Sequence, residues 1–296
     1  MKLFKTMIVF FIVAGILLVI GGIAMGATFE DITTFITNDQ DYQLVDPYTY
    51  QETIQTLEVD VTTRNVVIAP SEDDMISVSY YEKEDDIWNV TLVDHVLKVT
   101  LDEEFTISHW FSWSFASREV LTLTINIPAN ETFNIDATTN TGDIMLSHFL
   151  NVDTLNLKTD TGRIDVEDVD ATTATLDTAT GSVHYDLGNI DTKLSIDTNT
   201  GSVYISNVDT YQIDVNVDTG SIYLNQVNSN KIDLKSDTGS IYTTDLDLTN
   251  RTLKLQTDTG TVKVNNLSQG NEYNLVLTDS NYYLNATTDT GSINIS

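Results

Sequence analysis

The feature that most constrains this chain is a turn glycine that returns about every 20 residues through its second half. The successive intervals are 20, 19, 20, 19, 19 and 21 residues, and one further glycine follows after a longer gap. A fixed period of this length is typical of a stacked repeat array, in which each repeat contacts only its neighbours. The glycines are Gly142, Gly162, Gly181, Gly201, Gly220, Gly239, Gly260 and Gly291.

Within each repeat, apolar residues alternate with polar ones. Apolar side chains lie two and four residues after the glycine, as in Ile164 and Val166, and many lie seven and five residues before it, as in Leu155 and Leu157. A further apolar column lies seven residues after the glycine and ends at Leu267. Alternation with a period of two predicts half-buried strands. We therefore expect two short strands, two turns and five inward-facing side chains per repeat.

Two folds are compatible with this pattern. If the strand pairs close as hairpins, the result is an antiparallel meander. If each turn sends the chain into a second, facing sheet, the repeats coil into a parallel β-solenoid. Similar residues recur in register, as parallel stacking requires, so we predict an all-β chain with a parallel β-solenoid over residues 131–296. Its eight or so coils would rise by ~4.8 Å each.

The turns themselves carry an ambiguous motif. Asp160-Thr161-Gly162 has the tripeptide that aspartic proteases use at their active site, but it occurs five times, and Ala179 or asparagine replaces the acid in other repeats. A turn tolerates these replacements, whereas a catalytic carboxylate does not. Aspartate can accept hydrogen bonds from backbone N–H groups just downstream, and glycine supplies a positive φ. We therefore interpret the acids as structural turn residues: Asp160, Asp218, Asp237, Asp258 and Asp289.

Cofactor sites are weakly indicated. Stacking Asp218, Asp237 and Asp258 about 5 Å apart would create repulsion that cations relieve, and calcium takes carboxylate oxygens. The Gly-Gly-x-Gly-x-Asp pattern of calcium-binding rolls is absent, however. The chain has no cysteine, and its four histidines lack metal-ligand spacing. We expect no cofactor, with calcium at the stacked turns as the weaker alternative.

Net charge limits the partners. The formal charge is −30, from 44 acidic and 14 basic residues. Such a surface repels nucleic acid and anionic lipid and attracts cations, cationic peptides and basic faces of other proteins. Nucleic-acid binding is therefore excluded.

The amino terminus predicts the location. No charged residue occurs from Thr6 to Phe29, and this stretch is long enough to cross a bilayer as a helix. Lys2 and Lys5 precede it and Glu30 follows it, so the positive-inside rule predicts a single-pass anchor with a cytoplasmic amino terminus and an extracellular bulk. A cleaved signal peptide is the alternative, although the apolar run exceeds the usual length.

Four parts of the chain are expected. Residues 1–28 form the cytoplasmic tip and transmembrane anchor, and residues 29–50 a juxtamembrane spacer. Residues 51–130 contain strand patterns without the glycine period and form a β cap module that protects the first coil from edge pairing. Residues 131–296 form the solenoid.

Two surface features are candidate binding sites. Tyr204, Tyr223 and Tyr242 lie three residues after their glycines and would stack as an exposed ladder. This ladder could bind glycan or another chain, or it could only stabilise the coils by cross-strand packing. The aromatic stretch 105–115 could insert at the membrane interface or fold over the end of the rod.

A family resemblance follows from longer segments. "TLEVDVTTRNVVIAPSEDDMISVSYY", then "LTLTINIPANETFNIDATTNTGDIMLSHF" with Pro128, then the Thr-Gly repeats resemble the "putative adhesin" family of bacterial β-strand-repeat envelope proteins. That is a domain-of-unknown-function family frequent in Firmicutes, and the resemblance covers roughly residues 50–296. It implies an exported, membrane-anchored β-solenoid, linked to cell-envelope stress, and offers no catalytic residues to transfer.

These observations together predict a non-enzymatic envelope protein. We expect an anchored β-rod that acts as an adhesin or as a binding or scaffold protein, with an envelope glycan, a cationic ligand or another envelope protein as its partner. The alternative is a polysaccharide-active enzyme built on a β-helix, although no catalytic constellation in the sequence proposes one.

Overall fold

The computed structural model describes residues 39–103, 116–129, 132–278 and 280–296. This part of the chain is a rod of β-strands with one 3₁₀ turn, η1 (Asp39–Asp41). The strands are β1 (Gln43–Leu44), β2 (Tyr48–Tyr50), β3 (Thr56–Val61), β4 (Asn65–Pro70), β5 (Ile76–Ser79), β6 (Tyr81–Glu82), β7 (Asp86–Val93), β8 (Val96–Glu103), β9 (Thr122–Ile127), β10 (Phe133–Thr141), β11 (Ile144–Thr161), β12 (Ile164–Thr180), β13 (Val183–Thr200), β14 (Val203–Thr219), β15 (Ile222–Asn225), β16 (Asn228–Thr238), β17 (Ile241–Thr244), β18 (Arg251–Thr259), β19 (Val262–Val264), β20 (Leu267–Gly270), β21 (Glu272–Leu275), β22 (Tyr282–Thr290) and β23 (Ile293–Ile295).

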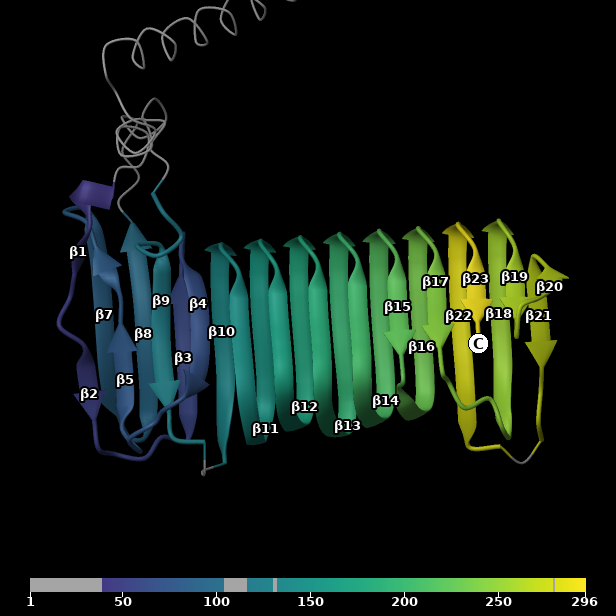
Figure 1. The fold of residues 1–296 in the computed structure, drawn as a ribbon, viewed down its shortest axis with the longest axis horizontal. Helices are drawn as coiled ribbons and strands as arrows, with labels where there is room; N and C mark the ends of the chain where they lie inside the picture. The colour runs from purple at the N-terminus through teal and green to yellow at the C-terminus, as the bar shows by residue number, and fades with distance from the viewer. Residues whose placement is uncertain (1–38, 104–115, 130–131, 279) are drawn as a thin grey trace, which may run out of the picture.

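The repeats form two facing sheets joined at the glycine corners (Figure 1). Because β11 to β14 run through both, hydrogen bonds make them one continuous 21-stranded sheet, and β1 and β6 form a separate pair. The first sheet contains the segments that precede each glycine, and the second contains those that follow it. Neighbouring coils pair in parallel and in register, for example Val203 with Ile222 and Val215 with Leu234. The prediction of an all-β chain built from parallel coils is therefore confirmed, and the antiparallel meander is wrong for the repeats.

Alternating apolar side chains fill the space between the two sheets. The column two residues after each glycine is fully buried, with no exposed surface at Ile144, Ile164, Val183, Val203, Ile222, Ile241, Val262 and Ile293. One coil has Gly188 where the others place an apolar residue, and there the buried ring of Tyr185 lies beside it. The Tyr185 hydroxyl donates to the Val169 carbonyl at 2.7 Å, which satisfies its polar group in the core. Close packing therefore continues through an irregular coil.

Each coil from that of Gly142 to that of Gly260 also has the second turn that the repeat pattern predicted, although the pattern did not place it at a particular residue. Six residues after the glycine, the backbone turns through a left-handed residue that is not glycine. Leu187 has φ 59°, and Asn207 has φ 55°. The strands β11 to β14 run through this corner, so each passes from the second sheet into the first. Asparagine and aspartate tolerate this conformation better than leucine does.

The amino-terminal end of the rod is closed by antiparallel strands. β3 and β4 form a coil that lies between β10–β11 and an outer coil made by β8 and β9. β7 pairs antiparallel with β8, and β5 pairs antiparallel with β9 and is itself covered by β2. These strands cover the edges that parallel coils would otherwise leave open. β1 and β2 fall within the predicted spacer, residues 29–50, yet they pair with strands of this end.

Arg64 stands where the other coils have glycine. Its carbonyl oxygen lies at the same place in the column as the glycine carbonyls. The side chain is 1% exposed and pairs with the buried Asp86 of β7 at 2.5 Å, while the ring of Trp88 lies 5.8 Å from the guanidinium carbon. The last corner before the cap is therefore fixed to the capping strand by a buried ion pair.

The carboxyl-terminal end does not follow the order of the sequence. β22 pairs with β16 on one side and β18 on the other, and β23 pairs with β17 and β19. The coil of Gly291 therefore lies between the coils of Gly239 and Gly260, as Figure 1 shows for β22 and β23. The last coils therefore do not stack in sequence order. The long gap before Gly291 contains β20 and β21, which close the end as antiparallel strands, so Leu267 is 68% exposed and does not join the core.

Candidate functional site

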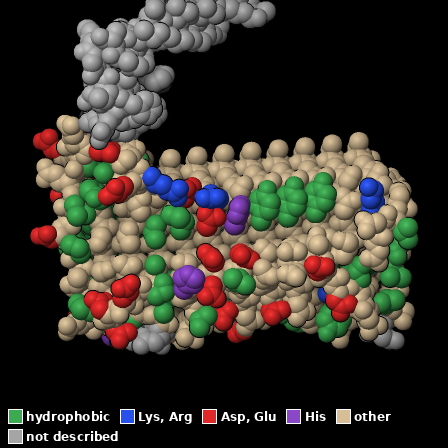
Figure 2. Space-filling model, viewed as in Figure 1, with side chains coloured by type: hydrophobic (Ala, Val, Ile, Leu, Met, Phe, Trp, Pro, Cys, Tyr) green, Lys and Arg blue, Asp and Glu red, His purple; other side chains and the backbone are tan. Residues whose placement is uncertain are grey.

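The main surface feature is a stack of tyrosine rings on the outer face of the second sheet. Tyr204 of β14, Tyr223 of β15 and Tyr242 of β17 occupy equivalent positions in three consecutive coils. Their ring centroids are 4.8 Å and 5.1 Å apart, and the ring planes are within 3° and 7° of parallel. We call these three residues the tyrosine strip. Figure 2 shows it as a row of hydrophobic side chains along the rod, next to a histidine.

The ring orientation decides what the tyrosine strip can offer a ligand. Each ring covers a face of its neighbour, so both faces of Tyr223 are occupied. On the other side of the stack, the His184 ring lies 4.6 Å from that of Tyr204, tilted by 59°. The strip therefore presents ring edges and phenol hydroxyls. A ligand that stacks on ring faces, as sugars do on isolated aromatic residues, has no free face inside the strip.

The side chains that flank the tyrosine strip are small and uncharged. On one side lie serines whose hydroxyls accept the backbone N–H of the next coil, as Ser202 does from Ser221 and Ser221 from Ser240, both at 3.1 Å. The other flank carries two further hydroxyls and an amide. The six flanking residues are Ser202, Ser221, Ser240, Ser206, Asn225 and Thr244. In a chain with 44 acidic residues, this neutral surface rich in hydrogen-bonding groups is distinctive.

Charged groups lie at the two ends of the tyrosine strip. Beyond His184, whose Nδ1 is 3.7 Å from Asp165, Arg163 pairs with the same carboxylate at 2.8 Å. At the other end, the equivalent positions are Asn294 of the inserted coil and then Lys263. An extended ligand aligned with the rod would therefore meet uncharged groups along its middle and charged groups at its ends.

The predicted turn glycines are required by close contact between coils. A Cβ built on Gly201 would lie 1.7 Å from the carbonyl oxygen of Gly181, and the one on Gly220 would lie equally close to that of Gly201. φ at Gly201 is +154°, in the region that favours glycine. The same contact recurs through the column, so each glycine is fixed by the backbone of its neighbour in the stack.

The predicted turn aspartates lie on the outside of this corner. The corner's hydrogen bonds come mainly from two other columns. Three residues before the glycine, a buried hydroxyl donates to the glycine carbonyl of the adjacent coil, as Thr159 does to Gly142 at 3.0 Å. One residue after the glycine, the side chain accepts an N–H, as Asp143 does from Arg163 at 2.9 Å. Asp160, Asp218, Asp258 and Asp289 are exposed and Asp237 is half-buried, and Asp237 pairs with Lys235 at 2.8 Å.

The order of the acidic column differs from the expected one. Asp289 lies between Asp237 and Asp258, because its coil is inserted there. Among the residues that the structure describes, no three His, Asp or Glu side chains are arranged to hold a metal ion. The calcium alternative therefore has no cluster to support it in this part of the chain.

A shallow groove of about 340 Å³ lies on the outer face of the first sheet. Asp214 and Asp233 line it, and both already have partners: Lys193 is 2.5 Å from Asp214, and the Tyr283 hydroxyl donates to Asp233 at 2.7 Å. Burial, together with this hydrogen bond, raises the pKa of Tyr283 to about 12. These carboxylates are engaged in cross-coil contacts.

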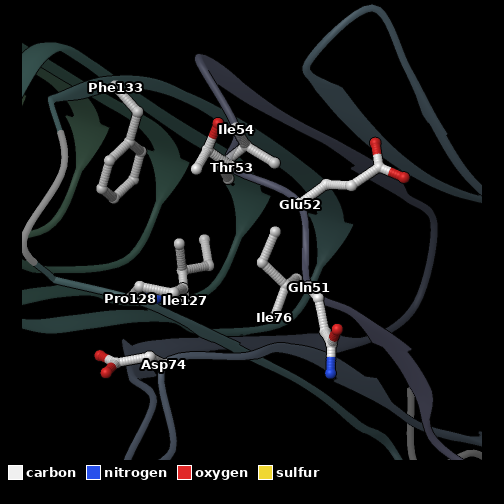
Figure 3. Close-up of a pocket in the computed structure, with 9 residues that line it drawn as sticks. All are labelled: Gln51, Glu52, Thr53, Ile54, Asp74, Ile76, Ile127, Pro128 and Phe133. Carbon is white, nitrogen blue, oxygen red and sulfur yellow. The ribbon is translucent and has the colours of Figure 1, made fainter.

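A second cavity, of about 150 Å³, lies where the cap meets the first glycine coil. Figure 3 shows Ile54, Ile76, Ile127 and Phe133 around it, while the carboxylates of Glu52 and Asp74 point outward. Its lining combines these apolar side chains with polar groups, and the cavity is too small for a drug-sized ligand.

Two predicted features fall outside the described residues. These are the transmembrane anchor, within residues 1–28, and the aromatic stretch, residues 105–115. In the part of the chain that the structure covers, no helix is long and apolar enough to cross a membrane.

Comparison with known proteins gives a family match and several distant structures. The model of the Toastrack DUF4097 family, a domain of unknown function, matches residues 54–222, more than half of the chain. No curated protein matches. A "putative cell adhesion protein" from Clostridium sporogenes aligns at 12% identity over 84% of this chain and 98% of its own (TM-score 0.34). A "putative adhesin" from Bacteroides fragilis aligns at 11% identity over 86% and 97% (0.46), and a "putative lipid binding protein" from Parabacteroides distasonis at 12% over 85% and 97% (0.39).

Proposed function

The chain belongs to the Toastrack DUF4097 family, and from this premise we propose that it is a non-enzymatic, membrane-anchored envelope protein that binds an uncharged envelope polysaccharide along its tyrosine strip. The apolar run at residues 6–29, with lysines before it and acids after it, supports a single-pass anchor with the rod outside the cell. The rod then presents the strip on its outer face to an extended partner.

The observation that carries this proposal is the chemistry of the tyrosine strip and its flanks. Three tyrosine rings, each with a phenol hydroxyl, repeat about every 5 Å along the rod, between two rows of small polar side chains that carry no charge. Such a surface matches a chain molecule with regularly spaced hydroxyl groups. A cationic ligand would gain more at the acidic surfaces elsewhere on the rod than here. We therefore favour a neutral glycan over a basic peptide.

The test is binding of the full-length chain in detergent to purified, insoluble cell-wall and surface polysaccharides, measured by co-sedimentation. A Tyr204/Tyr223/Tyr242→Phe triple variant keeps the ring stack and removes only the hydroxyls. We expect its binding to fall at least about tenfold, which corresponds to roughly 1.4 kcal/mol over three hydrogen-bonding groups. Tyr211→Phe removes the hydroxyl of another exposed tyrosine of β14 and is the matched control. Unchanged binding by the triple variant would refute the strip as the site.

The alternative of a polysaccharide-active enzyme is tested with the same samples. Incubation of the chain with those polysaccharides should release no new reducing ends if the protein only binds. Release of reducing ends that is abolished by Asp214→Asn or Asp233→Asn, and retained in the strip variant, would move the activity to the groove of the first sheet.

A further inference from the structure

The coil formed by β22 and β23 is the last in the sequence but not the last in the rod. We propose that residues 280–296 are an exchangeable coil, and that the slot between the Gly239 and Gly260 coils accepts the same segment from a second copy of the chain. Two rods would then associate by exchanging their carboxyl-terminal coils. This inference rests on the topology and does not depend on the tyrosine strip.

The coils on the two sides of the slot pair with each other only through the segment that fills it. In the described pairings, β18 pairs only with β22 and β21, and β19 pairs only with β23 and β20. The backbone of the end coil is therefore joined to the remaining rod by the inserted coil and by the connection after β17, and the Arg251 side chain of β18 adds a hydrogen bond to the Ser229 carbonyl. Without residues 280–296, β16 and β18 each present an unpaired parallel edge. Unpaired edges of this kind are templates for an incoming strand.

The inserted segment is anchored almost entirely by groups outside itself. Leu284, Ala286, Ile293 and Ile295 are at most 1% exposed. The Thr288 hydroxyl donates to the Gly239 carbonyl on one side, and the Gly291 carbonyl accepts from Thr257 on the other, both at 2.8 Å. A copy of the same segment from another molecule would meet identical partners. Exchange therefore preserves every one of these contacts.

Arg251 closes the slot where the inserted coil enters. Its side chain is 3% exposed and donates to four backbone carbonyls: Ser229 at 2.6 Å, Asn230 at 3.5 Å, Asp247 at 3.1 Å and Tyr283 at 3.0 Å. These carbonyls belong to β16, to the connection between the flanking coils and to β22. The Arg251 guanidinium of β18 thus bonds both to the inserted segment and to β16 on the far side of the slot. Burial lowers the pKa of Arg251. Loss of this contact should loosen the inserted coil.

A second copy is the partner that best matches the slot. The segment reads "SNYYLNATTDTGSINIS", with the alternation and Thr-Gly corner that the stack requires, and it contains a single charged residue, Asp289. Moving it between two rods of charge −30 therefore adds little local repulsion. The preceding residues are lightly held: Val276 is 75% exposed, and the Leu277 N–H donates to the Thr252 hydroxyl at 3.2 Å.

The extent of exchange follows from concentration. The closed and exchanged forms have the same contacts, so their balance depends on the effective concentration of the tethered segment. For short linkers this is in the millimolar range, so about a tenth of chains at ~0.1 mM should be exchanged. Exchange is fastest when the chains fold together, because in a folded chain the filled slot must first open.

The absence of cysteine in the native chain allows a direct test. Lys235 of β16 and Thr287 of β22 are register partners on the outer face, and adjacent parallel strands are close enough for a disulfide. Full-length Lys235→Cys and Thr287→Cys chains are unfolded together, refolded in detergent at ~0.1 mM and oxidised. With the two variants mixed equally, half of the exchanged dimers contain one chain of each kind, so a heterodisulfide should link about a twentieth of the chains and decline in proportion on dilution.

The matched control pair is Thr175→Cys with Ser195→Cys, register partners in the interior coils of β12 and β13. These coils are not inserted, so a heterodisulfide between the control chains reports only random collision. A yield for the slot pair no higher than for the control pair, at every concentration, would overturn the proposal. The Arg251→Met variant of the slot pair gives a second readout. We expect its heterodisulfide to form after mixing folded chains, severalfold faster than without the substitution. Equal rates would contradict the role of Arg251 in closing the slot.

Discussion

The coil of Gly220 has Val217 at a place where the other seven glycine-cornered coils have a threonine or a serine. In those seven, the side-chain hydroxyl donates to the backbone carbonyl one coil away, at 2.8 to 3.3 Å. Val217 is fully buried, so the Gly201 carbonyl beside it receives no such hydroxyl. A threonine at this position has the shape of valine and would supply the missing donor.

We predict that Val217→Thr increases the free energy of unfolding by about 0.5–1.5 kcal/mol, the net value of a typical buried hydrogen bond. The added hydroxyl is buried, but its partner is already in place, so no desolvated group is left unpaired. For a chain of this size, each kcal/mol of added stability raises Tm by about 2–4 °C. Thermal and urea unfolding followed by circular dichroism measure it.

Thr198→Val is the reverse substitution in the preceding coil. It removes the donor to the Gly181 carbonyl, whose bond is 3.3 Å long, and should cost about 1–3 kcal/mol because a buried acceptor is left unsatisfied. Val217→Thr replaces a methyl group by a hydroxyl, and Thr198→Val does the reverse. Any effect of side-chain volume on the free energy of unfolding is therefore opposite in the two variants. Destabilisation by Val217→Thr, or equal signs for the two variants, would refute the role assigned to this hydroxyl column.

Three further predictions concern the corners and the first sheet. Gly201→Ala should lose roughly 3 kcal/mol or more in urea unfolding, because its Cβ would lie 1.7 Å from the Gly181 carbonyl oxygen; a loss below about 1 kcal/mol would contradict the packing. Leu187→Asn should raise Tm by a few degrees, since asparagine relieves about 1 kcal/mol of left-handed strain at φ 59°, whereas Asn207→Leu in the next coil should lower it. Because the pKa of Tyr283 is raised to about 12 from an unfolded value near 10, the stability that this group contributes is complete below pH ~10 and is lost as pH rises through ~12. Tyr283→Phe should flatten this alkaline decline in pH-dependent melts, and an unchanged slope would show that other groups cause it.

The repeated part of the fold could be predicted from sequence because its pattern is local. The glycine period fixed the corners, and the alternation assigned inward residues such as Ile164 and Val203, which are fully buried. The family resemblance is also confirmed by the match over residues 54–222. The position of Gly291 was not predictable in the same way, because either order of the last two coils satisfies the same column pattern. The antiparallel strands β20 and β21 pair with the Gly260 coil and make it the end coil. They lie in the long interval before Gly291, where no repeat pattern marks them.

The candidate site was partly predictable. The spacing of Tyr204, Tyr223 and Tyr242 placed them in one column, and the structure brings them into a stack. Ring orientation depends on side-chain torsions, so the occupied ring faces could not be read from spacing. The turn aspartates were assigned the corner hydrogen bonds, yet the buried hydroxyls three residues before each glycine provide them. The alternation of Thr159 with apolar neighbours was the signal that marked it as inward-facing.

The uninterrupted glycine column has a consequence for the dimensions of the molecule. Gly181 and Gly201 have the same backbone geometry and the same contact to the preceding coil. Deleting residues 182–201 would join Gly181 to Ser202 across an equivalent corner, with both closed ends untouched. The distance over which the protein extends is therefore adjustable in increments of one strand spacing, ~4.8 Å, without redesign of either terminus.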